Sequence, residues 1–233
     1  MKSSEEQLKS RGFITIGYEK GFSDLSFNER IKLLRSDSPV ERSLGARLLS
    51  NNNNAESVSH LILALTIEKK LYPKIEICNS LVSFGKKAVV PLTGFIGKVG
   101  KNQHRKVSET KFKKDNYPLP RDIVCRTLIR IGDDALPYLS DMLDSKEINV
   151  LSEVIDTIGF ICFYKSDRGI YSKLLECFDR NPDNDLIRWK IFRALSAFPE
   201  SASFLETQRL ITVNQKIILE IDRSLFLIEK GAS

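Results

Sequence analysis

The sequence predicts an all-α protein built from consecutive helical pairs. Two segments repeat the same pattern, the stretches between turn signals have the length of helices, and no segment alternates apolar and polar residues as a strand does. The chain has 233 residues, of which 42% are hydrophobic and 28% are charged. This length and composition allow a sizeable core and exclude a disordered or collagen-like chain.

The first predicted helical pair begins at Ser38. Ser38 is a residue type typical of an N-cap. Pro39 follows at the first helical position, Glu41 lies in the first turn, and apolar residues then recur at helical spacing. A polar turn over 51–54 then precedes a second helix over 58–67. The order of cap, helix, turn and helix predicts a helical hairpin.

The clearest repeat covers residues 73–92 and 120–139. In each copy a Pro is followed twelve residues later by Gly, and then by Ala and a second Pro. We expect the first Pro in the first turn of a helix, where its missing N–H costs nothing. Gly85 and Gly132 permit a left-handed backbone that ends this helix, and the second Pro opens or kinks the next one.

Fainter copies of the pattern follow in the rest of the chain. Their apolar residues recur at three- and four-residue steps, and Gly159 and the Phe198–Pro199 pair supply breaks. We therefore expect helices over 150–158, ending at Gly159, then over 169–178, 187–195, 202–210 and 215–228.

The block from Asp37 to Arg42, and the second helices that begin at Gly85 and Gly132, resemble HEAT-like repeats of the phycobilisome-lyase type. This resemblance covers about residues 37–200 and implies a right-handed α-α superhelix, a solenoid of about five to six helix pairs. The concave face of such a solenoid typically binds a protein or a nucleic acid. We expect an N-terminal arm or cap at 1–21 and a single repeat domain over 22–233. The two clear copies lie 47 residues apart, where about 30 is usual, because of an insertion at about 99–117.

The positive charge of the chain is concentrated at this insertion, which we call the basic insertion. The formal net charge is +6, and residues 98–114 hold seven basic residues and one acidic residue, which is the whole excess. Lys or Arg placed on phosphates gives salt-sensitive affinity, and Phe112 and Tyr117 could stack on bases. The alternative is a solvated loop whose lysines only maintain solubility. The candidate residues for an anionic partner are Lys98, Lys101, Arg105, Lys106, Lys111, Lys113 and Lys114.

No motif predicts a catalytic residue, a metal ligand or a cofactor site. The four cysteines, at 78, 125, 162 and 177, lack the CxxC spacing of a zinc site, and we expect reduced, buried thiols. Residues 179–190 have oxygen-bearing side chains at the positions that a calcium loop requires. However, Asn184 and Lys190 occupy the positions where such a loop needs Gly and Glu. We therefore predict a turn that caps the next helix. His104 lies among cations that disfavour its charged form, and Trp189 is expected in the core.

The sequence also predicts a cellular location. Its first ten residues are polar, no apolar run approaches the roughly 18 residues of a membrane span, and the cysteines are unclustered. We therefore expect a cytoplasmic protein with no membrane partner.

Three functional hypotheses follow. The leading one is a non-catalytic binding scaffold that presents the curved surface of its repeats to a protein partner. The alternative is a nucleic-acid-binding protein that uses the basic insertion beside the concave groove. A third hypothesis, a HEAT-like DNA glycosylase, requires a catalytic Asp in an aromatic cleft, and the single Trp counts against it. The sequence leaves the identity of the partner and the oligomeric state open.

Overall fold

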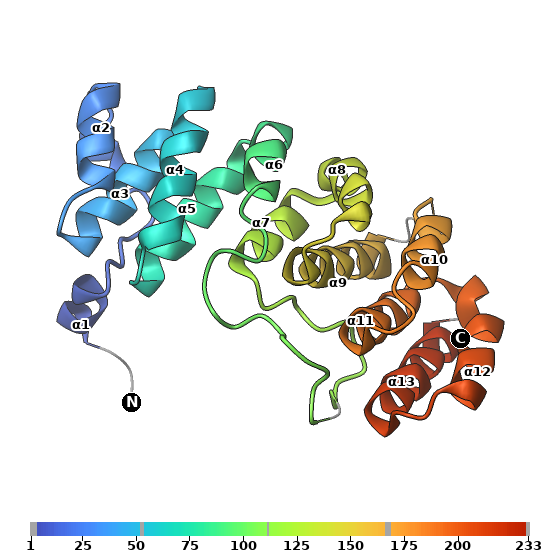
Figure 1. Cartoon of the computed structure of the whole chain (residues 1–233). Helices are drawn as coiled ribbons and strands as arrows, with labels where there is room; N and C mark the ends of the chain where they lie inside the picture. The colour runs from blue at the N-terminus through green and yellow to red at the C-terminus, as the bar shows by residue number, and fades with distance from the viewer. Residues whose placement is uncertain (1–3, 52–53, 111, 166–168, 232–233) are drawn as a thin grey trace. The chain divides into compact units, whose positions relative to one another are not determined.

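The computed structural model describes residues 4–51, 54–110, 112–165 and 169–231, and these residues form helices and irregular segments without a strand (Figure 1). The predicted all-α fold class is confirmed. The chain divides into two compact units, Met1–Val99 and Gly100–Ser233. The single repeat domain over 22–233 stays a prediction.

The first unit consists of consecutive helices packed around α3. α3 contacts α2 on one side and α5 on the other, and α4 packs on α5. As predicted, Ser38 caps α3 by accepting a hydrogen bond from the Glu41 N–H, and Pro39 is the first helical residue. The helices of this unit are α1 (Glu5–Ser10), the 3-10 helix η1 (Tyr18–Phe22), α2 (Phe27–Leu34), α3 (Pro39–Ser50), α4 (Ala55–Ile67), α5 (Leu71–Ser83) and α6 (Lys86–Thr93).

The N-terminal segment packs against α3. Ser43 donates to the carbonyl oxygen of Gly12 at 2.6 Å, and Arg47 donates to that of Thr15 at 2.7 Å. Gly12 has a φ of +88°, and a Cβ at this position would lie 2.7 Å from the Pro39 carbonyl oxygen. These contacts attach the segment to α3, and the arm or cap at 1–21 stays a prediction.

The second unit has two layers of helices. In one layer α11 packs between α9 and α13, and α7 packs on α9; in the other, α10 covers α11 and α12 covers α13. This alternation is that of an α-solenoid. The helices are α7 (Ile123–Ile131), η2 (Gly132–Ala135), α8 (Leu136–Asp141), η3 (Met142–Asp144), α9 (Ile148–Lys165), α10 (Tyr171–Asp179), α11 (Asp185–Leu195), η4 (Pro199–Ser201), α12 (Ala202–Ile211) and α13 (Gln215–Gly231).

Two details of the sequence prediction are wrong. Pro120 does not lie in the first turn of α7, because the Asp122 carboxylate accepts from the Val124 and Cys125 N–H groups and thereby starts the helix after the proline. Gly159 does not end α9, which continues to Lys165. The predicted positive φ is confirmed at Gly85 and Gly132, with values of +54° and +85°.

The absence of a side chain at Gly159 makes room for the basic insertion. A Cβ at this position would lie 2.1 Å from the Tyr117 hydroxyl oxygen. The Tyr117 ring is 2% exposed and packs edge-on against Phe160 and beside Phe163 of α9. Figure 1 shows the insertion as the long green trace between α6 and α7, and in the second unit it reaches α11 and α13. From Gly100 on, and apart from residue 111, which lies outside the described residues, the insertion belongs to this unit, where Gln103, Val107 and Tyr117 are buried and fix its path.

No helix within the described ranges is both long enough and apolar enough to cross a membrane.

Candidate functional site

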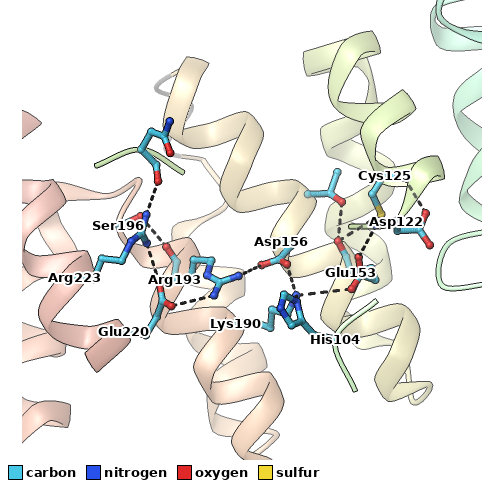
Figure 2. A network of polar contacts seen from close by, with 12 residues as sticks. His104, Asp122, Cys125, Glu153, Asp156, Lys190, Arg193, Ser196, Glu220 and Arg223 are labelled. Carbon is cyan, nitrogen blue, oxygen red and sulfur yellow. Dashed lines mark hydrogen bonds and ion pairs between the residues drawn. The ribbon is translucent and has the colours of Figure 1, made fainter. Parts of the chain in front are cut away.

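Six charged side chains form a buried ladder across α9, α11 and α13 (Figure 2). Each helix contributes two residues three positions apart, and this spacing places both on the same face of the helix. None of the six is more than 5% exposed. We call this set the charged ladder: Glu153, Asp156, Lys190, Arg193, Glu220 and Arg223.

Lys190 joins α11 to α9. Its ammonium group is fully buried, contacts the Asp156 carboxylate, and lies 3.7 Å from Glu153 Oε1. It also lies 3.2 Å from Nδ1 of His104, which comes from the basic insertion. One buried cation therefore connects two acids of α9 and the insertion.

Arg193 joins all three helices. Its Nη1 lies 3.6 Å from Asp156 Oδ1, and its Nη2 donates to Glu220 Oε2 at 3.0 Å. Arg223 donates to the other oxygen of Glu220 at 2.9 Å and to the backbone carbonyl of Asn116 in the insertion. Because a buried charge without its partner is costly, these contacts fix how the three helices and the insertion pack.

Burial and neighbouring charges shift the pKa values of the ladder. Burial raises the pKa of Glu153 to about 7, against the opposing charge of Lys190. Burial also disfavours the charge of Glu220, but Arg193 outweighs it and lowers the pKa of that carboxyl. The pKa of Arg193 itself is raised, because Glu220 and Asp156 together overcome the effect of burial.

The basic insertion contributes a neutral histidine to this region. Burial, together with the positive charges of Lys190 and Arg121, lowers the pKa of His104 to about 3. The neutral ring can accept a hydrogen bond from Lys190, and it lies edge-on to Trp189 with the ring centroids 5.1 Å apart. The predicted direction of the His104 pKa is thus confirmed, with burial as its largest cause.

The acidic residues of the insertion are ion-paired. Glu109 contacts Lys216 of α13 and lies 3.4 Å from Lys106, and Asp115 lies 3.1 Å from Lys230. By contrast, Lys101, Arg105, Lys113 and Lys114 are exposed and form no ion pair with any acid in the described part of the chain. The acids Glu109 and Asp115 of the insertion are therefore compensated, whereas four of its cations are open to solvent.

A pocket of about 540 Å³ lies between the insertion and the charged ladder. Asp156 and Arg193 of the ladder contribute to it, together with Phe160 and Tyr164 of α9. Its charged lining residues are four cations and one acid, a net of three positive charges. The lining residues from the insertion and the segment after it are His104, Ser108, Thr110, Phe112, Lys113, Lys114, Asn116, Tyr117, Pro118, Leu119 and Arg121.

The structure separates the seven candidate residues. Lys113 and Lys114 line this pocket, whereas Arg105 and Lys106 line a second depression beside Asp183 and Asp185, and Lys101 lines neither. Lys98 belongs to the first unit and donates to the carbonyl oxygen of Gly94 at 3.1 Å. Lys111 lies outside the described residues.

Sequence reasoning missed three charged residues of the pocket, and also its aromatic residues Phe160 and Tyr164. Arg121 follows the acidic Asp115, where the basic window ended, and Asp156 and Arg193 lie on helical faces taken as apolar. Tyr117 was expected to be free to stack on a base, but its ring is buried against α9. The available signal was the recurrence of charged pairs, three residues apart, in the alternate helices α9, α11 and α13.

The predictions for the cysteines, for Trp189 and for the turn before α11 are confirmed. All four cysteines are buried thiols, and Trp189 is 2% exposed. Asn184 caps α11 by accepting from the Ile187 N–H, so residues 180–184 form the expected turn between α10 and this helix. The described residues contain no cluster of three or more His, Cys, Asp or Glu side chains that could hold a metal ion.

The chain matches no protein-family model and no curated protein sequence. Among solved structures it is similar to two engineered proteins. The first is 14% identical with a TM-score of 0.40, and the match covers 88% of this chain and 97% of that one. The second is 16% identical with a TM-score of 0.41, and the match covers 89% of this chain and all of that one. It is also similar to a designed armadillo repeat protein, at 14% identity and a TM-score of 0.35, over 87% of this chain and all of that one. TM-scores of this size assign no function to the chain, and the HEAT-like identification stays a prediction.

Glu153 predicts an unusual pH dependence of stability. Its folded pKa of about 7 exceeds its ordinary value of 4.5, so the folded state retains a proton that the unfolded state has released, and the free energy of unfolding falls as pH rises through this window. Glu153→Gln removes this penalty. We expect the variant to gain up to about 3 kcal/mol relative to the wild type between pH 4.5 and 7.5, from roughly 1.4 kcal/mol per pKa unit.

Urea unfolding at several pH values measures this difference. His104 also makes the free energy of unfolding depend on pH, but with the opposite sign, because its folded pKa is lowered. This contribution is present in both proteins and cancels in their difference. Asp134→Asn, at an exposed position on η2, is the matched control and should track the wild type at all pH values. A difference between Glu153→Gln and the wild type that does not change with pH would show that Glu153 ionises normally.

Proposed function

We propose that the chain is a non-catalytic binding scaffold that holds single-stranded nucleic acid at the basic insertion of its second unit. Helical-repeat folds typically bind other macromolecules through extended surfaces. The charges of the insertion supply the selectivity for a polyanion. The phosphate backbone is contacted by the exposed cations that have no acidic partner.

The observation that carries this proposal is the charge balance of the packed insertion. Glu109 and Asp115 are compensated by Lys216 and Lys230 of α13. Lys113 and Lys114 are therefore available to bind an external anion, and both line the pocket together with Arg121. Because the insertion is packed rather than loose, little conformational entropy is lost when it binds.

A charge-reversal variant tests the proposal. We expect Lys113→Glu/Lys114→Glu to reduce affinity for an oligothymidylate of about twelve nucleotides by at least tenfold at low salt, because two phosphate contacts become repulsive. Fluorescence anisotropy of a labelled strand measures this effect. Urea unfolding of the same variant shows whether its fold is retained.

The matched control reverses two charges elsewhere in the second unit. Arg130 and Lys146 are exposed, and neither lines the pocket. Arg130→Glu/Lys146→Glu changes the net charge by the same amount and should keep most of the affinity. Equal losses in both variants would mean that only net charge matters, and an absence of binding by the wild type at low salt would overturn the proposal.

A protein partner, the leading hypothesis from the sequence, has one feature of its own in its favour. The first unit has a pocket of about 610 Å³ between α2 and α4, with Leu63 and Ile67 in its lining. These two side chains are 56% and 77% exposed. Exposed apolar side chains that gather at a groove are typical of protein-binding surfaces.

We propose no catalytic step. The glycosylase hypothesis requires an acid in an aromatic cleft, and Asp156 lies in such a pocket, but its carboxylate is ion-paired with both Lys190 and Arg193. Incubation with DNA that carries a methylated purine, followed by measurement of the released base, tests this alternative. The predicted cytoplasmic location stays a prediction.

A further inference from the structure

A groove on the first unit combines exposed apolar side chains with positive charge. It is the pocket of about 610 Å³ between α2 and α4. Leu63 and Ile67 of α4 line it and lie four residues apart, which places them on the same face of the helix. They are 56% and 77% exposed, so the described part of the chain leaves much of both side chains uncovered. These two side chains supply the apolar part of the groove.

The acid among the described lining residues, Glu68, is compensated within the unit. Arg42 donates from Nε and Nη2 to its two carboxylate oxygens, at 2.7 and 3.1 Å. The backbone N–H groups of Lys69 and Lys70 donate to Oε1 at 2.9 and 2.7 Å. Burial disfavours the charge of Glu68, but Arg42 and the Lys70 N–H outweigh burial and lower the pKa of the carboxyl. Glu68 therefore stays ionised, and Arg42 balances its charge.

Three other cations of the lining are open to solvent. Arg35, Lys69 and Lys70 are exposed and form no ion pair with any acid in the ranges that the structure describes. Nη2 of Arg35 lies 3.3 Å from Nδ1 of His60, one turn before Leu63 on α4, and the two lysines follow Ile67. Positive charge therefore lies at both ends of the apolar stretch of α4.

A molecule that complements this groove is apolar in the middle and acidic at both ends. A nucleic-acid strand supplies the charge but not the apolar contact, and the described lining has no Phe, Tyr or Trp on which a base could stack. The stretch of α4 from residue 60 to residue 67 is about 10 Å long, which is two helical turns. Apolar residues at positions i, i+4 and i+7 of a second helix cover the same length.

From this arrangement we propose that the groove docks an amphipathic helix of a protein partner. The apolar face of that helix covers Leu63 and Ile67, and its acidic residues lie at Arg35, Lys69 and Lys70. Complementary charge of this kind speeds association and selects the partner. This inference goes beyond the proposed function, because it concerns the first unit and a different class of partner.

Three synthetic peptides test both parts of the groove. Each is about fourteen residues long and is held helical by a side-chain lactam, because isolated helices of this length are marginal in water. The first has Leu at positions i, i+4 and i+7 and Glu at both ends; the second replaces each Glu by Lys, and the third replaces each Leu by Ser. In fluorescence anisotropy we expect the first peptide to bind the full chain roughly tenfold more tightly than either of the others, with an affinity that falls as salt rises.

Two variants locate the bound peptide. Leu63→Ser/Ile67→Ser should weaken binding of the first peptide roughly tenfold, and urea unfolding shows whether its fold is retained. The matched control is Ile75→Ser/Val90→Ser, at positions of the same unit that are 41% and 54% exposed and outside the groove, and it should bind as the wild type does.

Neutralising the three cations tests the charge. Arg35→Gln/Lys69→Gln/Lys70→Gln should lose the preference for the glutamate peptide over the lysine peptide. The control Arg11→Gln/Lys20→Gln/Lys86→Gln neutralises three exposed cations of the same unit outside the groove and should keep that preference.

Four results would overturn the docking groove. They are equal or absent binding of the three peptides, a preference that survives the change of the three cations, displacement of the peptide by oligothymidylate, and self-association of the wild type that Leu63→Ser/Ile67→Ser abolishes. The third result would assign the groove to a nucleic acid, and the fourth would assign it to a second copy of the chain. Loss of peptide binding alone leaves the proposed function standing, because oligothymidylate binding at Lys113 and Lys114 is measured separately.

Discussion

Lys190→Met should destabilise the protein by about 3–5 kcal/mol, which is the cost of removing one partner from a buried ion pair. The Lys190 side chain is fully buried, and its loss leaves Asp156 and Glu153 on α9 without their shared cation. Met retains most of the volume of the side chain, so the charge rather than a cavity accounts for the effect. Urea unfolding monitored by circular dichroism measures the change in the free energy of unfolding.

Two further variants identify the cause of this loss. Lys216→Met removes a lysine that is 43% exposed and pairs with Glu109, and it should cost at most about 1 kcal/mol. The double variant Asp156→Asn/Lys190→Met should lose less unfolding free energy than the sum of the losses of the two single variants. Each single change leaves a buried charge without its partner, whereas the double change removes both charges. Strict additivity would show that the pair is not energetically coupled.

Gly159→Ala should destabilise the protein by about 2–3 kcal/mol, although Ala favours a helix over Gly by roughly 1 kcal/mol. The added Cβ would lie 2.1 Å from the Tyr117 hydroxyl oxygen and 2.8 Å from Cα of Ala194 on α11. The hydroxyl belongs to a buried side chain and the Cα to a packed helix, so neither neighbour can yield cheaply. Thermal or urea unfolding measures the effect.

Gly231→Ala is the matched control, because a Cβ at that position meets no described residue within 4 Å. Tyr117→Phe should be nearly neutral, since it removes a buried hydroxyl that has no hydrogen-bond partner among the described residues. The same change should partly rescue Gly159→Ala by removing the closest contact. A stable Gly159→Ala protein, or the absence of rescue, would show that Tyr117 does not pack against α9.

The helices were predictable from the sequence because each carries its own local signals. Ser38 and Pro39 start α3, and Asn184 caps α11, as their side chains require. Gly159 misled the prediction, because a glycine within a helical pattern resembles a terminator unless its neighbour in space is known. Here that neighbour is Tyr117, which comes from a distant part of the chain.

The path of the basic insertion was not predictable from sequence pattern. Irregular segments have no periodicity, so nothing local indicates that His104 reaches Lys190 or that Asp115 reaches Lys230. The charged ladder could have been predicted in part. Pairs such as Lys190 and Arg193 fall in the buried phase of their helix, and buried charges are almost always paired.

In the proposed function, the exposed lysines Lys113 and Lys114 of the insertion contact phosphates. The salt dependence of oligothymidylate binding tests it most directly, because each phosphate contact on a single strand contributes about 0.7 to the slope of log affinity against log salt. Lys113→Ala/Lys114→Ala should reduce the slope by about 1.4, while Arg130→Ala/Lys146→Ala should leave it unchanged. An unchanged slope for the Lys113→Ala/Lys114→Ala variant would show that these two lysines contact no phosphate and would overturn the proposed function.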